Sequence, residues 1–233
     1  MVQVMGNAAD DWEEHARKWI EWARTPDLDS YWRYRDAFFD FLPPPGKSTL
    51  DIACGEGRLS RDLAERGHQV TGFDVSPTLI EAAREAHPGG EYLVADAGDL
   101  PFEDGSFDLV VAYCALMDID DMAGAVREAT RVLTPEGRLA ISVVHPANTG
   151  VKTEDGAFVV GDTYFEGTYQ REVVERDGVP MVFAGYTHPL TKYTDAFEAS
   201  GLLIEAVREP KAVHRDGSVS PYPWHLWLRV IKG

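Results

Sequence analysis

The sequence predicts an α/β fold with a Rossmann-like sheet of seven mostly parallel strands, in which the seventh strand is antiparallel. Two observations lead to this fold class. Apolar strand patterns alternate with helical patterns from residue 48 to residue 145, which is typical of a doubly wound parallel sheet. Two later strand patterns, at 202–208 and 224–231, have no helix between them, which predicts a hairpin. Ligands on such sheets bind outside the carboxyl ends of the strands.

The length predicts a single domain. A chain of 233 residues is long enough to bury one sizeable core. We expect a N-terminal helical lid at 1–45, the main part of the core at 46–146, a lid insertion at 147–188 and the C-terminal part of the core at 189–233.

The charge balance excludes several classes of partner. The net charge is −17 and no cluster of lysine or arginine offsets it, so we expect no nucleic-acid and no membrane partner. No apolar run approaches the roughly 18 residues of a membrane span, and the first residues lack a signal-peptide pattern. We therefore expect a cytoplasmic monomer or homodimer. Cys54 and Cys114 fit packing residues in a reduced compartment, and no cysteine–histidine spacing predicts a metal site.

Two helical patterns precede the first strand. Tryptophans recur at helical spacing within 10–24, which fits either a helix packed on the body or a mobile lid over a small-molecule site. A second helix is predicted over 29–42, where Tyr31 or Tyr34 is a candidate to stack on a cofactor. The prolines at 43–45 end this helix.

A glycine turn follows the first strand. The pattern predicts a buried strand at 48–53, a tight turn with Gly55 and Gly57, and a helix at 57–66. Glycines let the chain bend sharply and let a ligand approach the backbone. We expect Asp51 to point its carboxylate into the same crevice, where it would repel a pyrophosphate and suit a cationic ligand.

The next two strand patterns also end in acidic residues. The strand at 69–74 ends in Asp74, where a carboxylate can accept both hydroxyls of a ribose. Ser76 then caps a helix that begins at Pro77. The strand at 91–95 is followed by Asp96.

Two further strands complete this alternation. A strand at 107–113 is followed by a helix at 122–133 and a strand at 138–144. Asp118, between the first strand and the helix, is either a substrate contact or part of the cap of that helix. Five residues thus fall at carboxyl ends of parallel strands: Asp51, Asp74, Asp96, Tyr113 and His145.

The segment from 147 to 188 interrupts the alternation. Strand patterns at 171–176 and 180–184 flank Asp177-Gly178, which is a hairpin signal, and we expect this hairpin to fold over the pocket as a lid. Residues 157–161 and 164–170 fit loops or short strands. A helix is predicted at 190–200, directly after His188-Pro189.

The stretch from Asp51 to Ser60 resembles motif I of the class I S-adenosylmethionine-dependent methyltransferases, an acidic residue followed by x-G-x-G-x-G. Ala53 stands where the first glycine would be. The resemblance covers about 48–145 and extends to the small-molecule subgroup called type 11. It implies that S-adenosylmethionine is the cofactor, that Asp96 bonds the adenine amino group and that the Ala97 N–H meets a ring nitrogen. The implied cofactor contacts are Tyr34, Asp51, Ala53, Cys54, Gly55, Asp74, Val75, Ser76, Leu79, Asp96, Ala97 and Tyr113.

The resulting hypothesis is methyl transfer to the oxygen, nitrogen or carbon of a small organic acceptor. Histidine titrates near neutral pH, so His145 and His188 are the catalytic candidates. In one alternative the fold binds S-adenosylmethionine and catalyses a non-methylating reaction, or only senses the ligand. In another, the chain is a nucleotide-dependent oxidoreductase. Asp51 speaks against this second alternative, as does Ser60 in place of the third glycine of the dinucleotide motif.

Overall fold

The computed structural model describes residues 7–149, 151–152, 158–160, 164–211, 213 and 217–233. Its large sheet contains the strands β1 (Thr49–Ile52), β2 (Val70–Asp74), β3 (Glu91–Val94), β4 (Phe107–Tyr113), β5 (Leu133–Val144), β10 (Leu202–Arg208) and β11 (His225–Lys232). The helices are α1 (Ala8–Arg24), α2 (Tyr31–Phe41), α3 (Arg58–Glu65), α4 (Pro77–Ala86), α5 (Met122–Val132) and α6 (Leu190–Ala199). None of the described helices is both long and apolar enough to cross a membrane.

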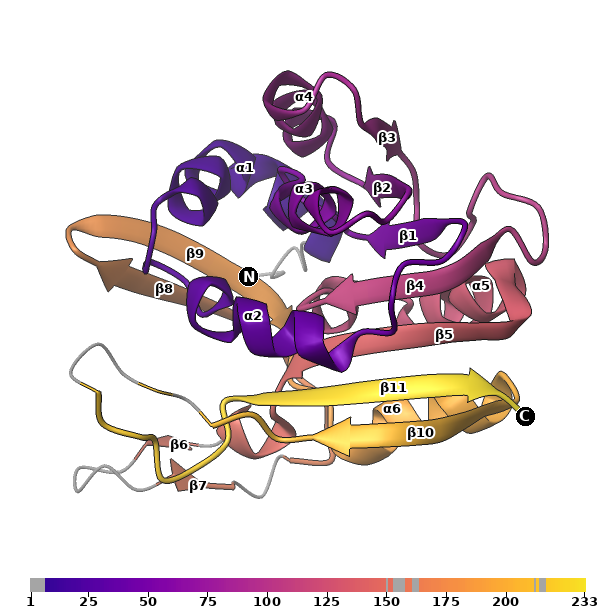
Figure 1. Ribbon diagram of the computed structural model, residues 1–233. Coiled ribbons are helices and arrows are strands. Elements are labelled where there is room, and N and C mark those ends of the chain that lie inside the picture. Colours follow the sequence, from indigo (N-terminus) through magenta and orange to yellow (C-terminus); the bar gives the residue numbers. More distant parts are fainter. Residues whose placement is uncertain (1–6, 150, 153–157, 161–163, 212, 214–216) are drawn as a thin grey trace.

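The seven strands have the order β10-β11-β5-β4-β1-β2-β3 (Figure 1). The strands β1 to β5 run parallel to one another, and β11 is antiparallel to both of its neighbours. The predicted fold class is therefore confirmed, including the antiparallel last strand. Because the order reverses between β1 and β4, their carboxyl ends flank the crevice where such sheets bind ligands.

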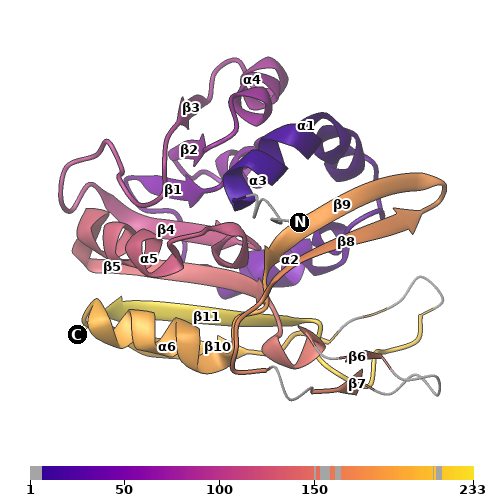
Figure 2. The ribbon, with the colours of Figure 1, turned by 180° about the vertical axis from the view of Figure 1, so that it is seen from behind.

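Helices cover both faces of the sheet. The helices α2 and α3 pack on one face, where Phe38 and Leu63 contact Val111 and Trp227. The helices α5 and α6 pack on the other face, in a larger core that includes Phe197 (Figure 2). The alternation of side chains along β4 divides them between these two cores, as expected for a strand that is buried on both faces.

A separate layer lies beside the carboxyl ends of the strands. The hairpin of β8 (Tyr169–Arg176) and β9 (Val179–Tyr186) packs along α1 (Figures 1 and 2). Trp22, Leu28 and Met181 form the buried centre of this layer, which we call the cover. The ring of Phe183 meets the rings of Trp19 and Trp22 edge to face, with centroids 6.1 and 5.7 Å apart.

Most predicted boundaries agree with the structure to within two residues, and one strand is longer. The strand β5 begins at Leu133, whereas the sequence predicts a turn at 134–137, because Leu133 pairs with Phe107 before a register shift. Two short 3-10 helices, η1 (Leu116–Asp118) and η2 (Pro146–Thr149), are additional. The strands β6 (Val151–Lys152) and β7 (Phe158–Val159) form a small sheet. Parts of the predicted segment 157–161 lie outside the described residues.

Candidate functional site

The glycine turn after β1 has an unusual backbone. Ala53, Gly55 and Gly57 have φ angles of 51°, 58° and 81°. Glycine adopts this left-handed region freely, whereas an alanine there is strained. A Cβ on Gly57 would lie 2.9 Å from Ala83 Cβ, so this glycine is also required by close packing. The turn thus brings the N-terminus of α3 against the strand end.

The neighbouring strand β4 ends in a second strained residue. Cys114 has a φ of 51°, and its N–H donates to the Ser142 carbonyl at 2.7 Å, which ties the bend to β5. Ala53 and Cys114 therefore lie at the carboxyl ends of adjacent strands, both in the left-handed region without being glycine. Strained backbone of this kind clusters at functional sites. The observation marks the β1–β4 edge as the candidate site.

Asp74 closes the glycine turn from β2. Its two carboxylate oxygens accept the N–H groups of Gly55 and Ser76, each at 2.9 Å. Burial raises the pKa of Asp74 to about 6, although these hydrogen bonds lower it. The Val75 backbone is a third donor to this carboxylate, so one of its about four acceptor positions remains for another donor.

Asp51 is more enclosed than the sequence indicates. Its carboxylate accepts a hydrogen bond from Ser60 Oγ at 2.5 Å, and the residue is 1 % exposed. The carboxylate thus lies against α3, and its contact with a ligand in the crevice stays a prediction. Burial raises the pKa of Asp51 to about 7, and the charge of Asp74 adds to this increase.

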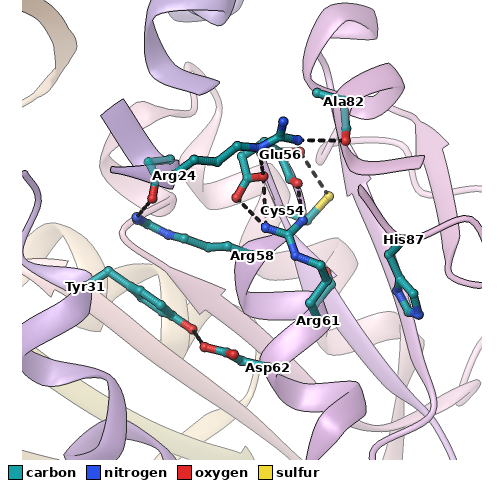
Figure 3. A network of polar contacts seen from close by, with 12 residues as sticks. Arg24, Tyr31, Cys54, Glu56, Arg58, Arg61, Asp62, Ala82 and His87 are labelled. Atoms are coloured by element: carbon teal, nitrogen blue, oxygen red, sulfur yellow. Dashed lines mark hydrogen bonds and ion pairs between the residues drawn. The ribbon is translucent and has the colours of Figure 1, made fainter. Parts of the chain in front are cut away.

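A buried carboxylate in the turn anchors three helices (Figure 3). Glu56 is 1 % exposed and forms ion pairs with Arg24 and Arg61, both at 2.9 Å. Arg24 also donates to the Ala82 carbonyl at 3.0 Å. Figure 3 shows these groups converging on the turn from α1, α3 and α4. The network fixes the C-terminal end of α1 to the glycine turn.

The N-terminal half of α1 lies over the end of β2. Glu13 accepts hydrogen bonds from the hydroxyls of Ser76 and Thr78, the latter at 2.6 Å. A Cβ on Gly55 would lie 3.2 Å from Trp19 Nε1, so this indole sits directly on the turn. The buried Trp12 Nε1 has no hydrogen-bond partner. The cover therefore closes the site from above, and Trp12 brings to it an indole donor that has no partner among the described residues.

The predicted adenine contacts lie along the next strand ends. Asp96 is exposed, and its carboxylate accepts the Gly98 N–H at 2.7 Å. Ala97 is 8 % exposed and Leu79 is 2 % exposed, whereas Val75 is open to solvent. Val75, Asp96 and Ala97 lie in the loops after β2 and β3 and Leu79 lies in the first turn of α4, and their contacts with a cofactor stay predictions.

Tyr34 and Tyr113 are packed between α2 and the sheet. The Tyr34 ring lies 4.8 Å from the His225 ring, and the Tyr113 ring lies 4.8 Å from that of Phe38. Both hydroxyls are buried and lack a hydrogen-bond partner. Their rings have little free surface for stacking, so any cofactor contact that they make is expected at the hydroxyls.

The two predicted catalytic histidines differ in their contacts. His145 Nε2 lies 2.9 Å from Glu209 Oε1, and Nδ1 accepts the Ala147 N–H at 3.0 Å, so both ring nitrogens are occupied. His188 is 8 % exposed and its Nε2 has no partner. Burial lowers the pKa of His188, and the charge of Lys192 adds to this decrease. His188 is thus the better-placed base, because its imidazole is neutral at neutral pH.

The sequence singled out Asp118 without deciding its role. The structure assigns the helix cap to Asp121, whose carboxylate accepts the Gly124 N–H at 2.9 Å. Asp118 ends η1 and its carboxylate makes no hydrogen bond or ion pair within the described part of the chain. Tyr193 of α6 lies near it and was missed, because its spacing within the helix is that of any core residue.

The described side chains fit a cationic nucleoside better than a dinucleotide. Asp51, Asp74 and Asp118 are enclosed acids whose pKa values are all raised by burial, and Asp74 adds to the increase at the other two. A pyrophosphate would meet these like charges, whereas a sulfonium would favour their ionised forms. The free hydroxyl and indole donors described above are further groups with which a ligand can bond.

Comparison with known proteins agrees with this geometry. Residues 50–141 match the family described as "Methyltransferase domain". The demethylmenaquinone methyltransferase of Thermotoga maritima is 36 % identical over 124 residues, which are 52 % of this chain and 54 % of that protein. A malonyl-[acyl-carrier protein] O-methyltransferase of Serratia marcescens is 32 % identical over 43 % of this chain and 39 % of that protein. The matched region thus spans about half or less of these relatives.

A solved structure extends the likeness to most of the fold. A putative S-adenosylmethionine-dependent methyltransferase from Listeria monocytogenes has a TM-score of 0.68 at 23 % identity, covering 85 % of this chain and 96 % of that one. Residues 50–141 are therefore similar to a methyltransferase domain, and the chain as a whole shares its fold with the Listeria protein.

Proposed function

We propose that this chain transfers the methyl group of S-adenosylmethionine to an oxygen, nitrogen or carbon atom of a small organic acceptor. The observation that carries the proposal is the set of enclosed acids at the ends of β1, β2 and η1, around a strained glycine turn. The relatives named above act on demethylmenaquinone and on malonyl-[acyl-carrier protein], and the first of these supports a small acceptor.

The cofactor side of the site binds and orients S-adenosylmethionine. When bound, S-adenosylmethionine supplies an electrophilic methyl group on a positively charged sulfur. Asp74 has an acceptor position left for a ribose hydroxyl, and Asp96 and Ala97 are the candidates for the adenine. Trp12 and Trp19 of the cover lie over this side and exclude water. Holding the reacting groups in line can itself supply several kcal/mol of barrier reduction.

The acceptor side lies between η1, the end of β9 and α6. We propose that His188 contacts the acceptor, since its Nε2 is buried and free. A catalytic role of His145 is less favoured, because Glu209 and the Ala147 N–H already occupy its ring. The net charge of −17 supports a small acceptor over a nucleic acid. The cytoplasmic location and the monomeric or dimeric state stay predictions of the sequence.

Calorimetry tests the cofactor. We expect S-adenosylmethionine and S-adenosylhomocysteine to bind with micromolar-range affinity, and NAD(H) not to bind. Asp74→Ala should weaken binding of S-adenosylmethionine at least tenfold, because a buried hydrogen bond contributes about 1–3 kcal/mol when its partner is lost. Asp99→Ala is the matched control, since this exposed acid lies in the loop after β3 and is expected to leave the affinity unchanged.

Transfer of label from [methyl-14C]S-adenosylmethionine to a small acceptor tests the reaction itself. A chain that binds S-adenosylmethionine and converts an acceptor without labelling it would instead catalyse a non-methylating reaction. Equal affinity of wild type and Asp74→Ala would remove Asp74 from the site, provided that both proteins melt at the same temperature.

A further inference from the structure

The carboxylate of Asp118 is held against the hairpin of the cover. The strand β9 packs on η1, and a Cβ placed on Gly185 would lie 2.3 Å from Asp118 Oδ1 and 3.0 Å from the Met117 carbonyl oxygen. No residue larger than glycine therefore fits at this position without moving the carboxylate. Tyr186, the next residue, donates to Asp120 at 2.7 Å and fixes the hairpin over η1.

Two further polar groups without hydrogen bonds among the described residues are connected to Asp118: Tyr193, on which its charge acts, and His188, which contacts Tyr193. Tyr193 of α6 is 2 % exposed, and the charge of Asp118 adds to the increase of its pKa that burial causes. His188 meets the Tyr193 ring edge to face, with centroids 5.7 Å apart, and stacks on Tyr186 at 5.3 Å. We call Asp118, His188 and Tyr193 the Asp118 cluster. Within the described residues, neither the carboxylate, nor His188 Nε2, nor the Tyr193 hydroxyl has a hydrogen-bond partner.

The backbone directs this cluster toward the candidate site. The strained Cys114 lies four residues before Asp118, and the charge of Asp118 helps to raise the pKa of its thiol. The charge of Asp74, at the end of β2, in turn helps to raise the pKa of Asp118. The carboxylate therefore lies between the acidic end of the cofactor side and the free groups of the cover and α6.

We propose that Asp118 is the catalytic residue that holds the acceptor and takes its proton, so that the acceptor is an O–H or N–H compound without negative charge. This inference rests on the proposed methyl transfer. The acceptor atom forms the bond to the methyl carbon, the carbon–sulfur bond breaks, and its electron pair stays on the sulfur, which becomes neutral. The proton of the acceptor passes to the Asp118 carboxylate and from there to solvent.

The surroundings of Asp118 explain both parts of the proposal. Burial raises the pKa of Asp118 well above its usual range, and Asp74 adds to this, so the carboxylate is a stronger base than an exposed one. The groups that face it are Asp74, Cys114, Tyr193 and the backbone of Gly185. None of these is a cation, so an acceptor that carries a carboxylate would be repelled, whereas a neutral phenol or an amine would be attracted.

Three small probes and one isosteric variant test this assignment. Wild type is first shown to bind S-adenosylmethionine by calorimetry, before any acceptor is added. Tyramine, catechol and phenylacetate are then offered with [methyl-14C]S-adenosylmethionine. We expect label in tyramine or catechol and none in phenylacetate. In Asp118→Asn, kcat should fall at least a hundredfold, which is within the range typical of general bases, while the Kd of S-adenosylmethionine stays within about threefold.

The pH profile separates a base from a structural residue. The rate of wild type should rise with pH as the carboxylate loses its proton, and this limb should disappear in Asp118→Asn. Gly185→Ala should also lower kcat, because the added methyl group displaces the carboxylate. Val173→Ala on the neighbouring strand is the control, since Val173 is 70 % exposed.

The outcomes that oppose the inference are distinct from those that oppose the proposed function. Methyl phenylacetate as a product, or a kcat of Asp118→Asn within threefold of wild type, would overturn the role of Asp118 and leave methyl transfer intact. A wild-type chain that binds no S-adenosylmethionine would overturn the proposed function itself.

Discussion

The cover and the Asp118 cluster differ in how their polar groups are satisfied. In and beside the cover, acids have partners whether they are buried or exposed: the exposed Glu13 bonds Thr78, the buried Asp11 pairs with Arg171 at 3.1 Å, and the exposed Asp120 accepts the Ala8 N–H at 3.1 Å. In the Asp118 cluster, a few residues away, the carboxylate, the imidazole and the phenol have none among the described residues. The half-buried Asp118 is less exposed than Glu13 and Asp120, so greater exposure to solvent does not explain why it lacks a partner.

This contrast indicates which region holds the fold together and which one awaits a ligand. An enclosed polar group without a partner costs about 1–3 kcal/mol, so it is retained where something else supplies the partner. An enclosed charged group with partners is part of the structure. Its removal destabilises the fold, because the charge of its partner is then left uncompensated. The two regions should therefore respond in opposite ways to substitution, one in stability and the other in turnover.

The largest effect on stability is expected at Glu56. Glu56→Gln would leave Arg24 and Arg61 without their shared charge next to a fully buried amide. We expect the free energy of unfolding to fall by about 2–3 kcal/mol, below the range for fully buried pairs because both arginines are partly exposed. Urea unfolding at pH 7 measures the change.

Asp36→Ala is the control for this substitution. Asp36 also forms ion pairs with two arginines, yet its side chain is 89 % exposed, so its loss should be within experimental error. An equal effect of the two substitutions would mean that enclosure does not distinguish them, and the contrast between the two regions would lose its basis.

The pH dependence of cofactor affinity tests the buried acids at the ends of β1 and β2. Burial raises the pKa of Asp74 to about 6 and that of Asp51 to about 7, so both carry protons at pH 5 and lose them by pH 8. A cationic sulfur favours the ionised forms, and we expect S-adenosylmethionine to bind at least tenfold more tightly at pH 8 than at pH 5. S-adenosylhomocysteine, with its neutral sulfur, is the matched ligand and should show a smaller change. The same change for both ligands would show that these acids do not sense the sulfonium.

Asp51 also predicts a pH dependence of folding in the absence of ligand. Its folded pKa of about 7 lies above the unfolded value of about 3.9, so the folded state holds the proton more tightly. This contribution to stability is complete below the unfolded pKa and is lost as the pH rises through about 7. Between pH 5 and pH 8, Asp51→Asn should lose less stability than wild type, by at least about 1 kcal/mol. An equal loss of unfolding free energy in the two proteins between pH 5 and pH 8, measured by urea unfolding, would contradict this.

Much of the fold could be predicted from the sequence because its signals are local. The alternation of patterns identifies the strands, the Ser76-Pro77 pair predicts the start of α4, and Asp177-Gly178 predicts the turn of the β8–β9 hairpin. Asp74 could be placed at the end of a parallel strand for the same reason. These predictions need only the neighbours of a residue along the chain.

The electrostatic state of the site could not be predicted in this way. Asp51 and Asp74 are equivalent in sequence, yet one lies beneath α3 and the other bridges the glycine turn. The carboxylate of Asp118 lies against Gly185, which is 67 residues further along the chain and offers it no side chain. The ring of His145 is occupied by Glu209, which is 64 residues further along. Which polar groups find partners is decided by tertiary packing, and a single sequence contains no local signal for it.

The smallest expected effect concerns the strain in the glycine turn. It tests whether the left-handed backbone conformation of Ala53 costs free energy. Ala53 has a φ of 51°, and a left-handed alanine costs about 1 kcal/mol. Ala53→Gly removes this cost but gives the unfolded chain more freedom, about 0.4–1 kcal/mol, so we expect a net gain of a few tenths of a kcal/mol. Ala64→Gly, within α3, is the matched control and should lose about 1 kcal/mol. Because both variants make the same chemical change, opposite signs in urea unfolding can come only from the backbone conformation. A loss at Ala53 equal to that at Ala64 would mean that the turn is not strained, and the marker that singled out the β1–β4 edge would no longer apply to it.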